Sequence, residues 1–400
     1  MHSLLYLSFA MIAGLLATRA AKKVHLPNVT GFLVAGLLIG PYIFNLIPSE
    51  SLEGLGFIST VALGFIAFSI GGEFKLSNIR AVGKNAVIIT FAQALATVAL
   101  VDLALWLFGY DVPLAITLGA IATATAPAAT LMVVRQYKAK GPLTNMLLPV
   151  VAMDDAIGLM VYSISLTMAK ALSSGQAITS RTMLVEPLLE IGLSLIVGVA
   201  IGFLTSLAMR FFRSKGNRLS ICIASVLLGV ALAKAYHLSD LLLCMAIGAA
   251  VVNLREDSSA LMDHTDAWTP PLLMLFFVIS GSELNIAMRP SVGVLGTIYI
   301  LVRSLGKYTG AALGARIVKA PQTIQKYLGI TLLPQAGVAI GMAQVASTAL
   351  PKYGATIHAV VLCATLIYEL LGPIATKIAL TKAGEIAVKP KKSKAQLLSE

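Results

Sequence analysis

The sequence has little charge, and this excludes an ordinary soluble protein. Only 12% of the 400 residues are charged, whereas soluble globular chains carry about 25%. Hydrophobic residues make up 58%, and a soluble chain of this size would need more polar surface than the remainder provides. The composition therefore predicts an all-α polytopic membrane protein.

Cysteine and histidine are also scarce. The three cysteines lie in apolar stretches, and no CxxC or Cys/His ligand spacing occurs, so we expect neither a disulfide framework nor a metal cluster. No Ser/His/Asp set or phosphate-binding loop is present either. We therefore expect no enzyme and no cofactor.

Long apolar segments repeat along the chain. A bilayer core of roughly 30 Å needs about 20 apolar residues per helix. Thirteen segments of this kind are predicted, at 3–20, 30–48, 53–71, 84–108, 112–134, 143–168, 185–212, 218–236, 239–254, 268–284, 290–315, 323–350 and 355–381.

Basic residues are distributed unevenly over the loops between these segments. The loops after odd-numbered segments and the tail hold 23 of the 30 basic residues, and the other loops hold five. The positive-inside rule places the basic side in the cytoplasm, with the N-terminus outside and the C-terminus inside. The net charge of +12 thus reflects topology, and we expect the bilayer, and no nucleic acid, as its partner.

Two pairs of motifs predict inverted repeats. Glu73 and Glu283 end segments 3 and 10, and each follows an apolar run with small residues. Segments 5 and 12, also seven apart, are both interrupted by proline and small residues, at 122–130 and at 333–339 with Pro334, Gln335 and Gly337. An odd offset reverses the orientation, and inverted repeats with matched broken helices are typical of secondary transporters. A kink without function remains the alternative.

This pattern predicts the domain organisation. A transmembrane domain would span 1–384, with repeats of roughly 1–170 and 218–382 linked by a helix at 185–212, and a short basic cytoplasmic tail would follow at 385–400.

A few charged residues fall inside the predicted segments, where each costs about 2.5–3.5 kcal/mol. Asp154 and Asp155 lie in the middle of segment 6. Adjacent carboxylates repel each other, so at least one holds its proton more tightly. Such a pair can trade a proton for a cation, and we expect Na⁺ to bind there together with free backbone carbonyls.

Segment 11 carries Arg303 and Lys307, one turn apart on one face. Both need partners, and the aspartates are the obvious supply. Arg303 lies nearer the middle of the segment, so we favour it at the depth of the aspartates, while Lys307 could snorkel.

Other polar residues in the segments are less specific. For Asp102 and Glu369, we favour a structural hydrogen-bonding role over a role in transport. Thr123 and Thr125 either satisfy unwound backbone or coordinate a cation.

These motifs resemble the cation:proton antiporter 2 branch of monovalent cation/proton antiporters. The resemblance rests on 122–130, the Asp154-Asp155 pair, Gly72-Glu73, Pro334-Gln335-Ala336-Gly337 and 369–373, and it covers essentially the whole chain. It implies a core domain with two crossed broken helices, a dimerisation domain, a homodimer and elevator-type movement. The double aspartate is similar to that of bacterial Na⁺/H⁺ exchangers.

The resemblance also implies residue roles. Asp155 would be the principal ion-binding carboxylate, and Asp154 would pair with a basic residue of segment 11. That partner is a lysine in electrogenic members. The sequence leaves Arg303 and Lys307 open, and with them the stoichiometry, because an arginine cannot release a proton.

The sequence therefore predicts an antiporter of the bacterial inner membrane that exchanges H⁺ for Na⁺ or Li⁺. K⁺/H⁺ exchange on the same fold is an alternative. A cation channel would need a continuous polar pore, and a Na⁺-coupled symporter a larger polar cavity, and neither pattern is evident.

Overall fold

The computed structural model describes residues 3–23, 28–72, 74–77, 83–126, 130, 133–134, 137–173, 186–212, 214–255, 257–283 and 290–386. The helices of the first half are α1 Ser3–Lys23, α2 Asn28–Ile39, α3 Ser49–Gly72, α5 Lys84–Leu107, α6 Val112–Ile121 and α8 Pro142–Ser173. α9 Glu186–Phe211 leads to α10 Lys215–Ala235, α11 Asp240–Leu254, α12 Ser258–Trp268, α13 Pro270–Ser282, α14 Pro290–Ile317, α15 Gln322–Thr331, α16 Gly337–Ala349 and α17 Gly354–Lys382.

Every predicted apolar segment contains at least one helix, and no strand occurs among the residues just given. Two segments contain a break: α6 ends early in segment 5, and segment 12 is divided into α15 and α16. α12 is an additional helix in a predicted loop. It was missed because it is short and carries polar residues throughout.

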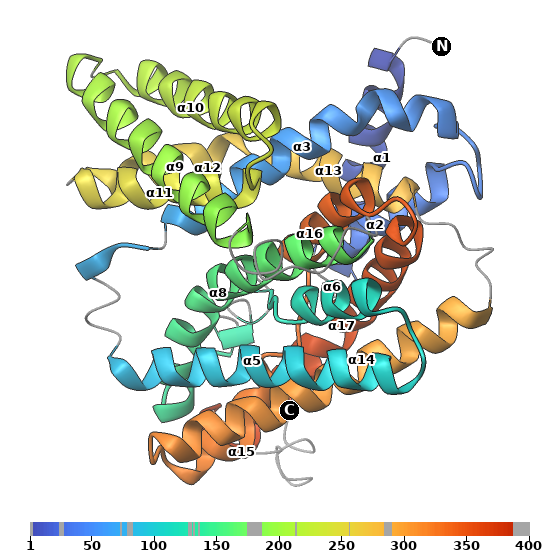
Figure 1. The fold of residues 1–400 in the computed structure, drawn as a ribbon, viewed down its shortest axis with the longest axis vertical. Helices are drawn as coiled ribbons and strands as arrows, with labels where there is room; N and C mark the ends of the chain where they lie inside the picture. The colour runs from blue at the N-terminus through green and yellow to red at the C-terminus, as the bar shows by residue number, and fades with distance from the viewer. Residues whose placement is uncertain are drawn as a thin grey trace, which may run out of the picture.

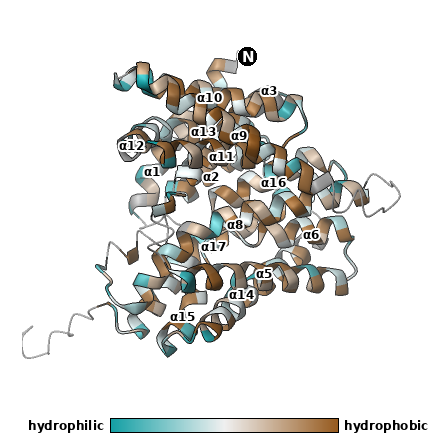
Figure 2. Ribbon diagram, turned by 60° about the vertical axis from the view of Figure 1, so that its left-hand side comes forward, coloured by the Kyte–Doolittle hydropathy of each residue, from teal (hydrophilic) through white to brown (hydrophobic). Residues whose placement is uncertain are grey.

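The helices have the surface of a membrane protein. Among the described residues, seven helices are long and apolar enough to cross a bilayer, and five shorter apolar helices accompany them. Large apolar side chains point outward, as on α9, where Leu188, Ile196 and Phe211 are 64%, 67% and 78% exposed. Figure 2 shows hydrophobic colours along most helices. Hydrocarbon chains, unlike water, stabilise such a surface, so the chain is an integral membrane protein.

The helices form two bundles (Figure 1). We call α5, α6, α8 and α14–α17 the core bundle, because α5 packs along α14, α6 on α8, and α15 and α16 on α17. The scaffold bundle consists of α1–α3 and α10–α13. α9 packs on α10 and α11 and also touches α8, so it joins the two bundles.

Glycines bring two helix pairs of the scaffold bundle into backbone contact. A Cβ at Gly36 of α2 would lie 2.0 Å from a carbonyl oxygen of α13, and one at Gly281 of α13 would lie 2.3 Å from a carbonyl oxygen of α2. Gly71 of α3 and Gly248 of α11 form the matching pair, at 2.0 and 2.1 Å. The predicted offset of seven segments relates α2 to α11 and α3 to α13. The inverted repeat stays a prediction, and this matched packing agrees with it.

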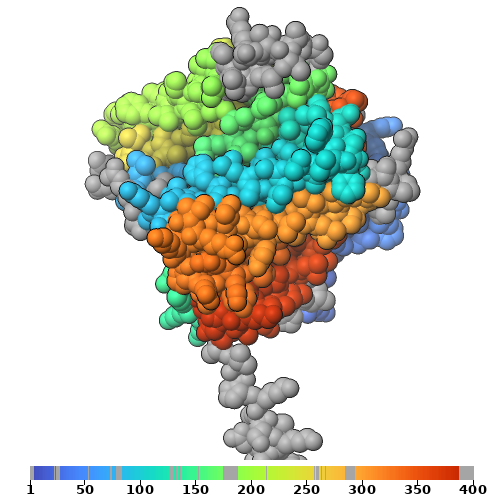
Figure 3. All heavy atoms as spheres, turned by 60° about the horizontal axis from the view of Figure 1, so that its bottom comes forward, coloured from blue at the N-terminus to red at the C-terminus, as the bar shows by residue number. Residues whose placement is uncertain are grey.

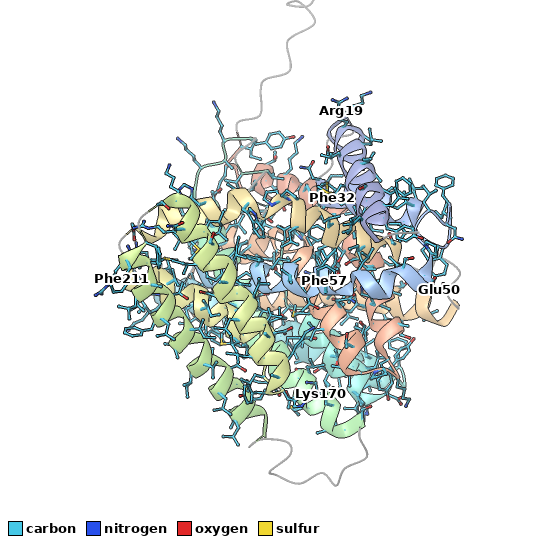
Figure 4. The ribbon with its side chains drawn as sticks, turned by 90° about the horizontal axis from the view of Figure 1, so that it is seen from above. Arg19, Phe32, Glu50, Phe57, Lys170 and Phe211 are labelled. Atoms are coloured by element: carbon cyan, nitrogen blue, oxygen red, sulfur yellow. The ribbon has the colours of Figure 1, made fainter. Side chains whose placement is uncertain are left out.

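The helix ends separate into two sides. In Figure 4, Arg19 and Phe211 lie on the upper-left side of a diagonal, and Glu50 and Lys170 lie on its lower-right side. The first two lie at predicted cytoplasmic ends and the last two at predicted outer ends. These four ends agree with the predicted topology, which stays a prediction for the chain as a whole.

Candidate ion-binding site

The two broken helices meet inside the core bundle. The backbone N–H of Ala126, after the first break, donates to the carbonyl of Pro334 in the second break at 2.9 Å. The Thr125 hydroxyl reaches the Leu332 carbonyl at 3.3 Å, and the Thr130 hydroxyl reaches the Thr331 carbonyl at 3.2 Å. Proline has no N–H to continue a helix, and α16 begins at Gly337. The breaks thus satisfy part of each other's backbone.

Arg303 of α14 holds both breaks from one side. Its side chain is fully buried, and its guanidinium donates to the carbonyls of Ala122, Ala124 and Leu333 at 2.9, 2.7 and 2.8 Å. These carbonyls follow the C-terminal ends of α6 and α15, where helix dipoles concentrate negative charge. A single fixed cation therefore neutralises both half-helices. It also lies 4.3 Å from the ring centre of Tyr368.

Lys307, and not Arg303, is the partner of Asp154. The Lys307 ammonium lies 2.7 Å from Asp154 Oδ2, and both side chains are fully buried. Lys307 also donates to the Thr125 hydroxyl at 2.8 Å and to the Thr123 carbonyl. The preference for Arg303 near the aspartates was wrong, because its guanidinium is committed to the backbone carbonyls of the breaks.

Asp154 is surrounded by donors. Besides Lys307, the Gln93 amide donates to Oδ1 and the Thr125 hydroxyl donates to Oδ2. Gln93 lies on α5 and is fully buried. The sequence offered a signal for it, an amide in the middle of an apolar segment, but not its direction. Asp154 is thus held in place by side chains from α5 and α14 and by the first break.

Asp155 is the carboxylate left available. It is only 4% exposed, and its Oδ1 atom has no hydrogen-bond partner in the part of the chain described here. It lines a cavity of about 320 Å³ together with Ala124 and Ala126 of the first break and Ala336 and Gly337 of the second. Hard monovalent cations favour carboxylate and carbonyl oxygens, as Ca²⁺ and Mg²⁺ do, and both kinds of group meet here.

This cavity opens toward one side of the molecule. Its other walls are the second half of α3, the first half of α13 and the start of α2, all of which are predicted cytoplasmic ends. On the opposite side, Ile66, Leu159, Leu241 and Val338 surround only a small apolar gap. Beyond this apolar seal lies an outer cavity of about 550 Å³, which Lys170 and Asp240 help to line. Asp155 therefore borders the cavity on the predicted cytoplasmic side, and apolar side chains lie between it and the outer cavity.

Gln335 and Thr123 support the breaks. The Gln335 amide donates to the Ile121 carbonyl and to the Tyr299 hydroxyl, both at 3.0 Å. The Thr123 hydroxyl bonds the Ala120 carbonyl at 2.6 Å. Both side chains therefore satisfy backbone or neighbouring groups of the crossing.

Asp102, Glu283 and Glu369 do not line the cavity beside Asp155. Asp102 packs against α6, where a Cβ on Gly119 would lie 1.8 Å from its Oδ1 atom. Glu369 is buried on α17. Glu283 follows α13 and approaches His358 of α17 at 3.6 Å. Glu73 falls outside the described residues. The predicted similarity of Glu73 and Glu283 thus stays untested.

Comparison with known proteins gives a family and a fold. Residues 7–382 match the family described as "Sodium/hydrogen exchanger, transmembrane". Na(+)/H(+) antiporter 1 of Methanocaldococcus jannaschii is 27% identical over 195 residues, which span 48% of this chain and 45%, less than half, of that relative.

Two solved structures of the sodium proton antiporter MjNhaP1 from Methanocaldococcus jannaschii resemble this fold. The match to one of them has a TM-score of 0.79 at 18% identity and covers 95% of this chain and 98% of the MjNhaP1 chain. The other has a TM-score of 0.74 at 19% identity and covers 96% and 98%. The predicted fold class is thereby confirmed. The match over 7–382 shows that the chain belongs to the sodium/hydrogen exchanger family of membrane transporters, which confirms at the family level the predicted Na⁺/H⁺ antiporter and the expectation that it is not an enzyme.

Proposed function

We propose that this chain exchanges Na⁺ or Li⁺ for H⁺ at Asp155. The observation that carries the proposal is the difference between two adjacent buried carboxylates. Asp154 is saturated by Lys307, Gln93 and Thr125, whereas Asp155 faces a cavity with an unbonded oxygen. A carboxylate of this kind binds either a proton or a cation, and this competition couples the two fluxes.

The apolar seal supports alternating access. Asp155 communicates with one side through its cavity, and apolar side chains of both bundles close the other. The side chains that meet at this part of the boundary, such as Leu159 of the core bundle and Leu241 of the scaffold bundle, are apolar, so no hydrogen bond between them has to break when the core bundle moves against the scaffold bundle. An elevator-type movement would carry Asp155 across the seal, as the family resemblance implies.

Lys307 bears on the stoichiometry. Unlike arginine, a lysine can release its proton when it is buried. If Na⁺ binding weakens the ion pair with Asp154, Lys307 becomes a second proton carrier. We therefore propose the electrogenic two-proton scheme of the double-aspartate, cation:proton antiporter 2 branch.

The cellular setting follows from the same resemblance. We propose a homodimer in a bacterial inner membrane, with the N-terminus outside and the C-terminus in the cytoplasm. The asymmetry of the loop charges supports this orientation.

Proteoliposomes test the function. Wild type, Asp155→Asn and the matched control Asp111→Asn would be compared for cation-driven proton movement, with Na⁺, Li⁺ and K⁺ in turn and the membrane potential clamped or free. Asp111 is a surface carboxylate paired with Lys352. We expect Asp155→Asn to abolish exchange in a folded protein and the control to preserve it. Full exchange by Asp155→Asn would overturn the mechanism, and exchange driven best by K⁺ would reassign the substrate.

A further inference from the structure

A polar groove runs along the outside of the core bundle, between α14 and α15. It encloses about 630 Å³, and its polar lining includes Arg316, Lys326, Gln325 and Thr309. Figure 3 looks at this face, with α14 and α15 in orange below α5 in light blue. None of these side chains takes part in the ion site described above.

The groove extends to membrane depth. Its lining runs along α14 from Tyr308 to Arg316, about 12 Å at 1.5 Å per residue. Tyr308 directly follows Lys307, whose side chain reaches the ion site. Leu305, Leu313 and Ile317 of the same helix are 53%, 53% and 60% exposed. This face of α14 is therefore in contact with lipid, where hydrocarbon alone would leave polar groups unsolvated.

The charge of the groove is positive and unbalanced. Within the described chain, no carboxylate lies within 4.0 Å of the Arg316 guanidinium or the Lys326 ammonium. The Gln325 amide is fixed by a bond to the Ala320 carbonyl at 2.7 Å. Arg316 lies in the last turn of α14 and Lys326 in the first half of α15, on the predicted cytoplasmic side, next to the leaflet that carries anionic lipids. A planar guanidinium binds phosphate oxygens through two parallel bonds.

We propose that this groove binds the headgroup of an anionic phospholipid from the cytoplasmic leaflet. Arg316 and Lys326 would hold the phosphate, and the Ala312 and Leu313 side of the groove would receive the glycerol end of the acyl chains. The exposed apolar surface around the groove favours a lipid over free phosphate. α15 leads directly into the second break, so a bound headgroup would also steady the half-helix that ends at the ion site.

The purified full chain tests this proposal. Wild type, Arg316→Ala/Lys326→Ala and the matched control Arg210→Ala/Lys215→Ala would be extracted from vesicles of equal phosphatidylglycerol and phosphatidylcholine, and retained lipid counted by native mass spectrometry. The control residues are exposed and lie at the same predicted side. We expect wild type and control to retain phosphatidylglycerol preferentially. The groove variant should retain about tenfold less phosphatidylglycerol than wild type, or less still, because each basic residue contributes to anionic lipid binding.

Four results of the retention measurement would overturn the proposal. The first three are equal retention by the groove variant, an equal loss in the control, and no preference for phosphatidylglycerol in wild type. The fourth is complete displacement of lipid by millimolar inorganic phosphate, since the site would then belong to a soluble anion. A photoreactive phosphatidylglycerol added to wild type gives a readout that does not depend on whether the variants fold. Label on the α14–α15 peptide supports the proposal, and label confined to other peptides refutes it.

Discussion

Replacing Arg303 tests how the two broken helices are held together. Arg303→Gln removes the fixed cation but leaves a side chain of intermediate length, and Arg303→Lys keeps the charge without the planar fork. The three carbonyl bonds of Arg303, at 2.7–2.9 Å, are the interactions at stake. The change leaves the Asp154–Lys307 pair chemically intact.

The expected loss can be worked out from these bonds. A hydrogen bond to a charged group contributes about 1.5–3 kcal/mol, so the gross interaction is roughly 5–9 kcal/mol. A glutamine amide can satisfy at most two of the three carbonyls, and neighbouring backbone can relax. We therefore expect Arg303→Gln to lower the free energy of unfolding by about 3–5 kcal/mol and Arg303→Lys by about 1.5–3 kcal/mol.

The measurements are thermal unfolding of the purified protein and Na⁺-driven proton exchange in proteoliposomes. The control is Lys352→Gln, which breaks a surface ion pair whose side chains are 69% and 55% exposed and should change stability by less than about 1 kcal/mol. We expect the melting temperature to fall least in the control, more in Arg303→Lys and most in Arg303→Gln. The rate of exchange should fall in the same order. If Arg303→Gln melted and exchanged like wild type, the proposed role at the crossing would be refuted.

Three further outcomes are expected. Lys307→Ala should abolish exchange and lower stability by about 3–5 kcal/mol, because it leaves Asp154 unpaired, and adding Asp154→Asn should restore the melting temperature but not exchange; unchanged stability in Lys307→Ala would contradict the buried pair. Gly36→Leu should unfold the protein or sharply lower its melting temperature, because even a Cβ would lie 2.0 Å from a backbone oxygen, whereas Gly54→Leu, with open space around it, should not. Hydrogen bonds from neighbouring arginines lower the pKa of Asp257, in the loop before α12, to about 2. The stability that this group contributes is present above its ordinary pKa of about 3.9 and is lost as the pH falls toward 2. The melting temperature of Asp257→Asn should therefore fall less steeply than that of wild type between pH 4 and pH 2. An unchanged slope would count against the arginine contacts.

Much of the fold could be predicted because it is recorded in local composition. Hydrocarbon thickness sets the length of an apolar segment, so the helices fall where the apolar segments lie. Proline and small residues at 333–339 interrupt such a segment wherever it packs, and the structure contains a break there. The aspartates were identified for a similar reason, since a charge inside an apolar run is costly in any arrangement of the helices.

α12 and Gln93 show where this reasoning stops. α12 is short and polar, so it has no hydropathy signal. Gln93 stands out as an amide in an apolar helix, but its bond to Asp154 depends on how α5 packs beside α8. The sequence gives the chemical type of a side chain, but it does not give the neighbouring helix that the side chain faces in the folded protein.

The basic residues of α14 show most clearly what the sequence determines and what only the tertiary structure decides. The sequence by itself determined that two buried cations, one turn apart, need partners, and it offered the two aspartates for that role. Only the tertiary structure decided that Arg303 binds the carbonyls of both breaks while Lys307 binds Asp154. The reason is distance: one helical turn is about 5.4 Å, and an ion pair needs contact within about 4 Å. The depth at which the broken helices cross, which no segment contains alone, selects the residue that reaches the aspartate.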